Sequence, residues 1–252
     1  MTTRFEILAA AALAFGASVP AQAAPELGVK NIVLVHGAFA DGSGWKAVSD
    51  ILTRRGYNVS IAQPPETSLE DDVAATNRIL DRQDGPAILV GHSYGGAIIT
   101  EAGNNPHVSA LVYVAAFQPD AGESVGALLQ SMPAVSNSIA PSADGFLYID
   151  SSRFHADFAA DLPHVTSDFM ARSQVGLSVK AVGAPIANPA WKTKPSYAIV
   201  AKDDRSINPE LERSMYKRSG AITTEISGSH AVYISQPKAV AAVIEKAAKS
   251  AN

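Results

Sequence analysis

Short apolar runs alternate with longer amphipathic stretches along most of this chain, and this alternation constrains its fold more than any other feature. Such alternation predicts an α/β fold with a mostly parallel sheet of about six strands, flanked by helices on both faces. The predicted strands are Asn31 to Val35, Asn58 to Ala62, Ala87 to Val90, Ala110 to Val114, Tyr197 to Ala201 and Ala221 to Ile226. The predicted helices are Trp45 to Arg55, Leu69 to Arg82, Tyr94 to Gly103, Pro209 to Arg218 and Gln236 to Lys249.

Composition indicates one globular domain and excludes several classes of protein. Of the 252 residues, 47% are hydrophobic and 17% are charged, which suits a single domain with a sizeable core. A net charge of -4 provides no broad basic surface, so binding to nucleic acid or to an anionic membrane lacks its electrostatic driving force. The sequence has no cysteine, which excludes disulfides, cysteine-ligated metals and thiol nucleophiles.

The first residues have the pattern of a secretory signal peptide. Arg4 precedes an apolar stretch from Ile7 to Phe15, and Ala21-Gln22-Ala23 matches a small-x-small cleavage signal. We therefore expect residues 1–23 to be removed, leaving a mature domain of residues 24–252 that is secreted or periplasmic. A structured N-terminal helix is the alternative interpretation. No later segment has the apolar length of a membrane span.

The alternation is interrupted between Gln118 and Lys194, where Pro, Ser, Ala and aromatic residues mix without a clear strand. An insertion of this length inside a compact domain is usually functional, so we expect residues 118–194 to form a small cap over the active edge of the sheet. Its aromatic and methionine side chains suit either an apolar substrate pocket or a core within the cap. These residues are Met132, Phe146, Tyr148, Phe154, Phe158, Phe169 and Met170.

The segment Gly91-His92-Ser93-Tyr94-Gly95-Gly96 follows an apolar strand and opens an apolar helix. It matches G-x-S-x-G in the strand-turn-helix context that a nucleophilic serine requires. Glycine is needed because a Cβ at Gly91 or Gly95 would clash with neighbouring backbone in so sharp a turn. Ser93 would lie at the positive end of a helix, where a developing oxyanion is stabilised. We predict that Ser93 is the nucleophile.

A second glycine-containing loop, His36-Gly37-Ala38-Phe39, follows the first predicted strand. Such a loop can turn a backbone N–H toward the serine and supply half of an oxyanion hole. A phosphate-binding loop is the competing interpretation. It is disfavoured because Gly42 is followed by Ser43-Gly44, without the G-K-[ST] ending that phosphate binding needs.

A serine hydroxyl needs a base and an acid that orients the base, and chain position suggests both. His230 follows the last predicted strand, so it returns to the same sheet edge as Ser93. His36 and His92 lie inside the turn motifs and His107 in a connection, while His155 and His164 lie in the cap.

For the acid, Asp203 and Asp204 both lie just beyond the end of a strand, where a parallel sheet presents its reactive groups. Asp204 is preferred over Asp203, and Asp120 remains an alternative. The run Glu70-Asp71-Asp72 suits a helix start. The cap acids and histidines have no H-E-x-x-H spacing, so we predict a solvated surface there and no metal.

At these positions the chain resembles the α/β-hydrolase superfamily. In detail it is similar to the branch that contains plant methylesterases, hydroxynitrile lyases and bacterial carboxylesterases such as pyrethroid hydrolases. The resemblance implies oxyanion donors at the N–H groups of Ala38 and Tyr94, with Asp204 as the acid. The matching segments are Leu34-Val35-His36-Gly37-Ala38, Gly44-Trp45, Gly91 to Gly96, Asp203-Asp204 and Gly228-Ser229-His230.

The function implied is hydrolysis of small, largely apolar carboxylic esters through an acyl-enzyme, without a cofactor. Two alternatives remain on the same fold. A slow-turnover receptor would bind a small molecule tightly. A lyase would cleave cyanohydrins, but the lyases of this branch carry a threonine at the position of Gly37 and a lysine shortly after the base, where this chain has Ala231-Val232.

Overall fold

The computed structural model describes residues 2 and 28–251 of the chain. The predicted signal peptide, residues 1–23, lies outside the described residues apart from Thr2, so it stays a prediction. Within the described part, no helix is both long enough and apolar enough to span a membrane.

A six-stranded sheet forms the centre of the molecule, and every pairing in it is parallel. The strand order is β2-β1-β3-β4-β8-β9, so the chain starts near the middle and moves outward in both directions. The central strands are buried along nearly their whole length, whereas the edge strands β2 and β9 are partly exposed and carry polar residues. The strands are β1 (Asn31–Val35), β2 (Asn58–Ala62), β3 (Ala87–Ser93), β4 (Val108–Ala116), β8 (Ser196–Ala201) and β9 (Ile222–Ile226).

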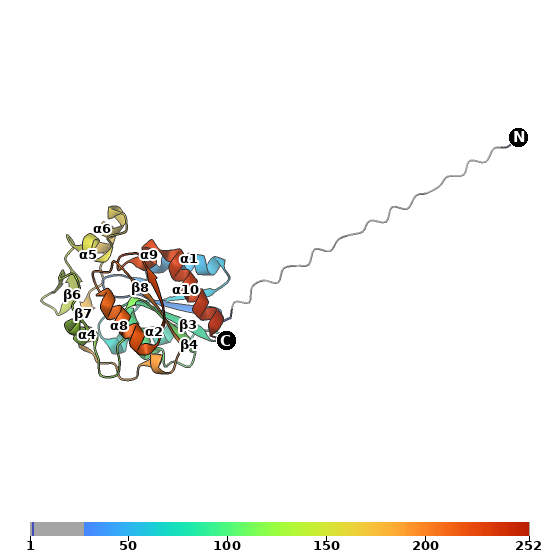
Figure 1. The fold of residues 1–252 in the computed structure, drawn as a ribbon, viewed down its shortest axis with the longest axis horizontal. Coiled ribbons are helices and arrows are strands. Elements are labelled where there is room, and N and C mark those ends of the chain that lie inside the picture. The colour runs from blue at the N-terminus through green and yellow to red at the C-terminus, as the bar shows by residue number, and fades with distance from the viewer. Residues whose placement is uncertain (1, 3–27, 252) are drawn as a thin grey trace.

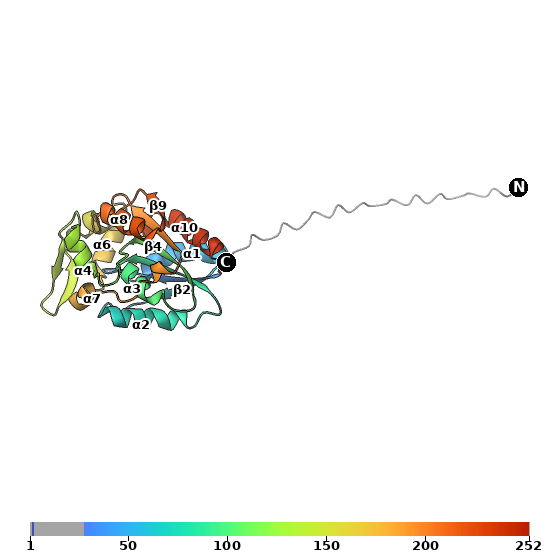
Figure 2. The same cartoon turned by 60° about the horizontal axis from the view of Figure 1, so that its bottom comes forward.

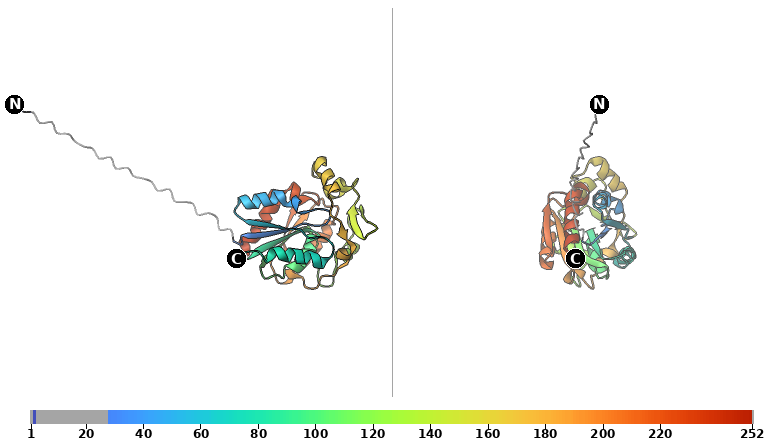
Figure 3. Two further views of the ribbon diagram at one scale, coloured as in Figure 1. Left: turned by 180° about the vertical axis from the view of Figure 1, so that it is seen from behind. Right: turned by 90° about the vertical axis from the view of Figure 1, so that its right-hand side faces the viewer.

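Helices cover both faces of this sheet (Figure 2). Helices α1 (Lys46–Arg54) and α10 (Pro237–Ser250) pack on one face, where Trp45, Leu52 and Ile244 belong to one buried cluster. Helices α2 (Leu69–Leu80), α3 (Gly95–Ala102) and α8 (Pro209–Ser219) contribute to the second cluster on the other face. Seen from behind, the strands run between α1 and α2 (Figure 3, left). The predicted fold class is therefore confirmed.

The segment between β4 and β8, which we call the cap segment (residues 117–195), lies at the end of the sheet opposite the C-terminus (Figure 1). It contains a three-stranded antiparallel sheet, although the sequence showed no clear strand there. Its strands are β5 (Ile139–Pro141), β6 (Phe146–Ile149) and β7 (Leu177–Ser178). Its helices are α4 (Val125–Ser131), α5 (Phe154–Phe158), α6 (His164–Arg172), α7 (Val179–Gly183) and the 3-10 turn η2 (Ala190–Lys192).

Two short elements complete the fold, and both adjoin the expected loops of the site. The 3-10 turn η1 (Gly42–Trp45) begins at Asp41, whose carboxylate accepts the N–H of Ser43. The short helix α9 (Val232–Ser235) follows His230 directly. Because parallel strands all end at the same edge of the sheet, the loops after β1, β3, β8 and β9 meet at one place.

Candidate active site

Ser93 lies at the sharp turn between β3 and α3. Its backbone φ is 53°, in the left-handed region where a residue with a side chain is strained. A Cβ at Gly91 would lie 2.5 Å from the carbonyl oxygen of Gly95, and one at Gly95 would lie 2.6 Å from that of His36. These contacts confirm that glycine is required at both positions. The strain is maintained by close backbone packing on both sides of the serine.

A chain of hydrogen bonds joins Ser93, His230 and Asp204. The His230 Nε2 atom lies 2.8 Å from the Ser93 Oγ atom, and His230 Nδ1 lies 2.6 Å from Asp204 Oδ2. All three residues are buried, with Ser93 6% exposed. Each comes from a different loop at the carboxyl edge of the sheet, so the fold brings together residues that are up to 137 positions apart.

Asp204 is held rigidly in front of His230. Its Oδ1 atom accepts the N–H groups of Ser206 (2.7 Å) and Ile207 (2.8 Å), which leaves Oδ2 for the histidine. The two other candidate acids lie elsewhere. Asp120 pairs with Lys192 at 2.5 Å, and the Asp203 side chain belongs to an exposed residue.

A buried glutamate, which the sequence analysis did not single out, lies beside this acid. Glu212 on α8 is fully buried, and its Oε2 atom accepts the N–H of Ala201 at 3.2 Å. Burial, and then the negative charge of Asp204, raise the pKa of Glu212 well above its ordinary value. A protonated Glu212 places no second negative charge beside Asp204.

The loop after β1 lies directly against the serine. A Cβ at Gly37 would lie 2.5 Å from the His92 carbonyl oxygen and 2.6 Å from the Ser93 Cβ atom. This close approach brings the backbone of Ala38 next to Ser93, and both line the same cavity together with Tyr94. Phe39 then has a φ of 64°, and its N–H donates to the Val175 carbonyl at 3.1 Å. The candidate oxyanion donors Ala38 and Tyr94 therefore both adjoin the serine.

Behind this loop lie two buried acids whose roles the sequence analysis missed. Asp72, read as part of a helix start, is fully buried and accepts the Tyr94 hydroxyl at 2.7 Å. It also accepts the N–H of Glu66 at 2.6 Å, and the Glu66 carboxyl lies 3.4 Å from His36 Nδ1. Burial raises the pKa of Asp72 and raises that of Glu66 further above its ordinary value. The signal available in the sequence was the tyrosine at position 94, inside the serine motif, because a buried tyrosine hydroxyl needs a hydrogen-bond partner such as Asp72.

The base histidine is packed between aromatic rings. The Phe158 ring from α5 meets His230 edge-on, with centroids 4.8 Å apart, and the His92 ring lies 4.7 Å away on a tilted plane. His92 Nε2 donates to the His230 carbonyl at 2.9 Å, so this ring holds the backbone of the base. Burial lowers the pKa of His92 well below its ordinary value, so this ring is neutral beside the base.

Two acids of the cap segment hold the loops that carry His230 and Asp204. Asp157 is buried, which corrects the expectation of a solvated surface at that residue, whereas Asp161 is exposed as expected. The carboxylate of Asp161 accepts the Ser229 N–H (3.0 Å), the Ser229 hydroxyl (2.5 Å) and the Ser235 hydroxyl (2.7 Å). The Asp157 side chain is 1% exposed, and it accepts Arg205 Nε at 3.1 Å. Burial alone would raise the pKa of Asp161, but the hydrogen bonds from Ser229 and Ser235 outweigh it and lower the pKa.

Next to Ser93 lies a cavity of about 150 Å³, which we call the inner cavity. Ser93, His230 and Ser206 supply its side-chain polar groups, and the rest of its wall is apolar. Of the seven cap residues named from the sequence, none lines this cavity, and Phe154 and Phe158 are buried core residues instead. The cap residues that do line it are Phe117, Val125, Leu129, Ile139, Leu147, Leu177 and Val182.

Among the described residues, no group of three or more His, Asp or Glu side chains is arranged to hold a metal ion. His155 and His164 of the cap instead stack on each other with ring centroids 3.7 Å apart, and His155 Nδ1 lies 2.9 Å from the Ser167 hydroxyl. The remaining histidine, His107, lies 3.3 Å from the Gly85 carbonyl, immediately before the start of β4.

A parallel sheet with a serine elbow, an acid and a histidine at its carboxyl edge defines a hydrolase of the α/β type. Residues 32–243 match the model of the Alpha/beta hydrolase family, and the chain belongs to this family. The predicted superfamily is thereby confirmed.

Known relatives agree with this class. A pyrethroid hydrolase from Sphingobium wenxiniae is 28% identical, with 86% of each chain covered. A carbendazim-hydrolysing esterase from Nocardioides is 35% identical, but the match spans 39% of this chain and 47% of that protein. The crystal structure of a pyrethroid hydrolase from Sphingobium faniae is 26% identical with a TM-score of 0.76, covering 88% of this chain and 98% of the other. The chain is a hydrolase, and these relatives support ester hydrolysis in general.

Proposed function

We propose that this protein hydrolyses carboxylic esters by acyl transfer to Ser93. His230 Nε2 takes the Ser93 proton while Oγ bonds to the ester carbonyl carbon, and the carbonyl electron pair moves to oxygen. The N–H groups of Ala38 and Tyr94 stabilise that oxyanion. The bond to the alkoxide then breaks, and His230 returns its proton to the departing alcohol.

Deacylation repeats the same cycle with water as the nucleophile. Asp204 stays ionised throughout and holds His230 in the tautomer whose Nε2 is free to accept a proton. These reaction steps require no cofactor, because every proton passes between side chains of the protein, the substrate and water. The observation that carries the proposal is the continuous hydrogen-bonded chain from Ser93 to Asp204 at the wall of an apolar cavity.

Cyanohydrin cleavage, the other activity implied by the resemblance, is not favoured. The lyases of that branch use a threonine where this chain has Gly37, but a Cβ there would lie 2.5 Å from the His92 carbonyl. Ala231 and Val232, which follow the base, are buried apolar residues and supply no cation for a departing cyanide. We therefore expect ester turnover with only background cyanide release from mandelonitrile.

A fluorophosphonate probe followed by a panel of methyl and p-nitrophenyl esters tests the proposal. We expect one probe molecule per chain, attached at Ser93, and many turnovers on at least one ester. Labelling without turnover would instead indicate a ligand-binding protein on this fold. A protein that neither reacts with the probe nor hydrolyses any ester would refute the proposal.

A further inference from the structure

The two candidate oxyanion donors, the N–H groups of Ala38 and Tyr94, lie on separate loops, one after β1 and one after β3. Neither N–H donates to a backbone carbonyl within the residues that the structure describes, so both are free to bind an oxyanion. Such a pair is effective only when both groups point at one position, about 2.7–3.1 Å from the oxyanion. The two loops therefore have to be held in a fixed relation to each other.

The side chain of Asp72 on α2 reaches both of these loops. Its Oδ2 atom accepts the Tyr94 hydroxyl at 2.7 Å, so the side chain of one donor residue is anchored. Its Oδ1 atom accepts the Glu66 N–H at 2.6 Å, and the Glu66 carboxyl lies 3.4 Å from His36 Nδ1. His36 stands two residues before Ala38. One carboxylate thus contacts the loop after β3 directly and the loop after β1 through Glu66.

This arrangement costs free energy that a simple helix start would not require. Asp72 and Glu66 are both fully buried, and Glu66 has a φ of 60°, in the left-handed region where a side chain is strained. The start of α2 is already capped by Ser68, whose Oγ atom accepts the Asp71 N–H at 3.1 Å. Buried acids and backbone strain that the helix does not need point to a role at the adjoining site.

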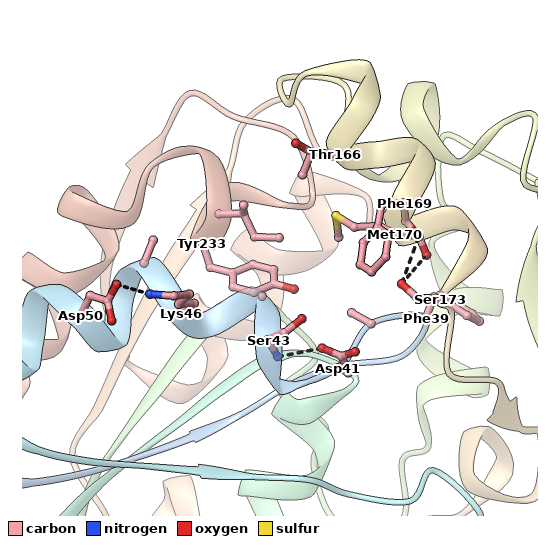
Figure 4. A pocket seen from close by; sticks show the side chains of 14 residues that line it. Phe39, Asp41, Ser43, Lys46, Asp50, Thr166, Phe169, Met170, Ser173 and Tyr233 are labelled. Carbon is pink, nitrogen blue, oxygen red and sulfur yellow. Dashed lines mark hydrogen bonds and ion pairs between the residues drawn. The ribbon is translucent and has the colours of Figure 1, made fainter.

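The outer part of the loop after β1 is held by other contacts. The Phe39 N–H donates to the Val175 carbonyl at 3.1 Å. Further along, the Asp41 carboxylate accepts the Ser43 N–H at 2.7 Å (Figure 4). Neither of these bonds reaches the loop after β3. The carboxylate of Asp72 supplies the connection between the loops that these two bonds lack.

We propose that Asp72 is a positioning residue of the oxyanion hole and aligns the N–H groups of Ala38 and Tyr94. It does so by holding the Tyr94 hydroxyl and the Glu66 N–H on one carboxylate. This role rests on the ester hydrolysis proposed above and adds a residue to its machinery. Asp72 is fully buried and does not line the inner cavity. Its loss should therefore weaken binding of the transition state and leave binding of the ester unchanged.

Two pairs of variants test this role. Tyr94→Phe removes the hydroxyl but keeps the ring and the backbone N–H. Tyr113→Phe is its matched control, because Tyr113 is a buried tyrosine of the same apolar cluster whose hydroxyl lies 3.0 Å from Thr100 on α3. Asp72→Leu removes both bonds of the carboxylate. In Asp72→Asn the amide oxygen and NH₂ can still bond the Glu66 N–H and the Tyr94 hydroxyl oxygen.

Each variant is assayed for turnover of methyl acetate and for inhibition by 1,1,1-trifluorobutan-2-one, whose adduct with Ser93 places an oxyanion in the hole. We expect Tyr94→Phe and Asp72→Leu to lower kcat and kcat/KM by the same factor, about 10- to 100-fold, as a misplaced donor does. Ki for the ketone should rise by that factor too. Asp72→Asn should recover most of the activity lost in Asp72→Leu, and Tyr113→Phe should match the wild type in both assays.

Three results would overturn the proposal. These are a loss in Tyr94→Phe no larger than in Tyr113→Phe, slower turnover without weaker ketone binding, and an Asp72→Asn variant as slow as Asp72→Leu. Tyr94→Phe decides the matter alone if Asp72→Leu fails to fold. A wild-type protein that hydrolyses no ester and does not bind the ketone would instead refute the proposed function, and this role with it.

Discussion

At the edge of the sheet, the groups around Ser93 are positioned mainly by backbone. The turn is fixed by buried strands and by glycines at which a Cβ would lie only 2.5–2.6 Å from neighbouring backbone oxygens. In the cap segment, by contrast, side chains supply several of the contacts to the site, chiefly the carboxylates of Asp157 and Asp161. The two regions thus act on the same site by different means, so substitutions in them should differ in size and kind of effect.

The largest effect is expected at the sheet edge, from Ser93→Ala. The substitution removes the nucleophile and leaves the packing of the turn unchanged, because the hydroxyl contacts only His230 among the residues described. Turnover should fall on the order of a million-fold, as it does when a serine nucleophile is removed in other hydrolases. Steady-state assays on freshly purified variant and wild type measure it, with circular dichroism to show that the fold is kept. Near-wild-type activity would remove Ser93 from the mechanism.

The next effect concerns the acid. Asp204→Asn keeps the shape of the side chain but favours the wrong tautomer of His230, which should lower kcat about 10⁴-fold. Asp203→Asn and Asp120→Asn are the controls, because neither residue lies beside His230, and each should cost far less. A larger loss at Asp120 than at Asp204 would move the acid to the loop after β4.

A smaller effect is expected from the cap segment. In Asp161→Asn, an amide NH₂ replaces one of the two carboxylate oxygens, so at least one of the donors from Ser229 and Ser235 loses its acceptor. We expect kcat to fall about 10- to 100-fold, as a misplaced catalytic group does, with KM nearly unchanged. Asp144→Asn, which alters a carboxylate bonded to Ser142 in the β5–β6 turn, is the matched control. If both variants had equal effects, the cap would not position the base.

The smallest effect is on stability and depends on pH. Because burial raises the pKa of Glu66 in the folded state, Glu66 favours folding below its unfolded pKa of about 4.3 and loses that contribution as pH rises. Glu66→Gln keeps the shape of the side chain, but an amide does not ionise, so the stability of the variant does not fall in this way as pH rises. We expect its Tm to exceed that of the wild type at pH 8 by about 2–4 °C, or about 1 kcal/mol, and by less at pH 4.5. Thermal unfolding at both pH values decides it, and a pH-independent difference would contradict it.

Much of the sheet could be predicted from the sequence because buried parallel strands are continuous apolar runs. The bounds of β1 and β2 agree with the prediction, while β3 extends three residues further, to Ser93. The extension was missed because Gly91 and His92 are poor strand formers, yet both pair with β4. Tertiary pairing there outweighs local preference.

The cap segment and the buried acids could not be predicted in the same way. Strands β5, β6 and β7 are two to four residues long, too short for a periodic pattern. Asp72 and Asp157 looked like a helix start and a surface acid because their partners, Tyr94 and Arg205, are distant in sequence. Local sequence patterns identify the residues that can react. The residues that position them are decided by contacts between segments that are distant in the sequence.

The central claim is that Ser93 forms a covalent acyl-enzyme. Rapid mixing with p-nitrophenyl acetate, followed by an acid quench and peptide mass mapping, tests it directly. The account predicts a burst of about one p-nitrophenol per chain and an acetyl group on the peptide that contains Ser93, both absent in Ser93→Ala. Ester turnover without acetylation of that peptide, or a burst that survives in Ser93→Ala, would contradict it.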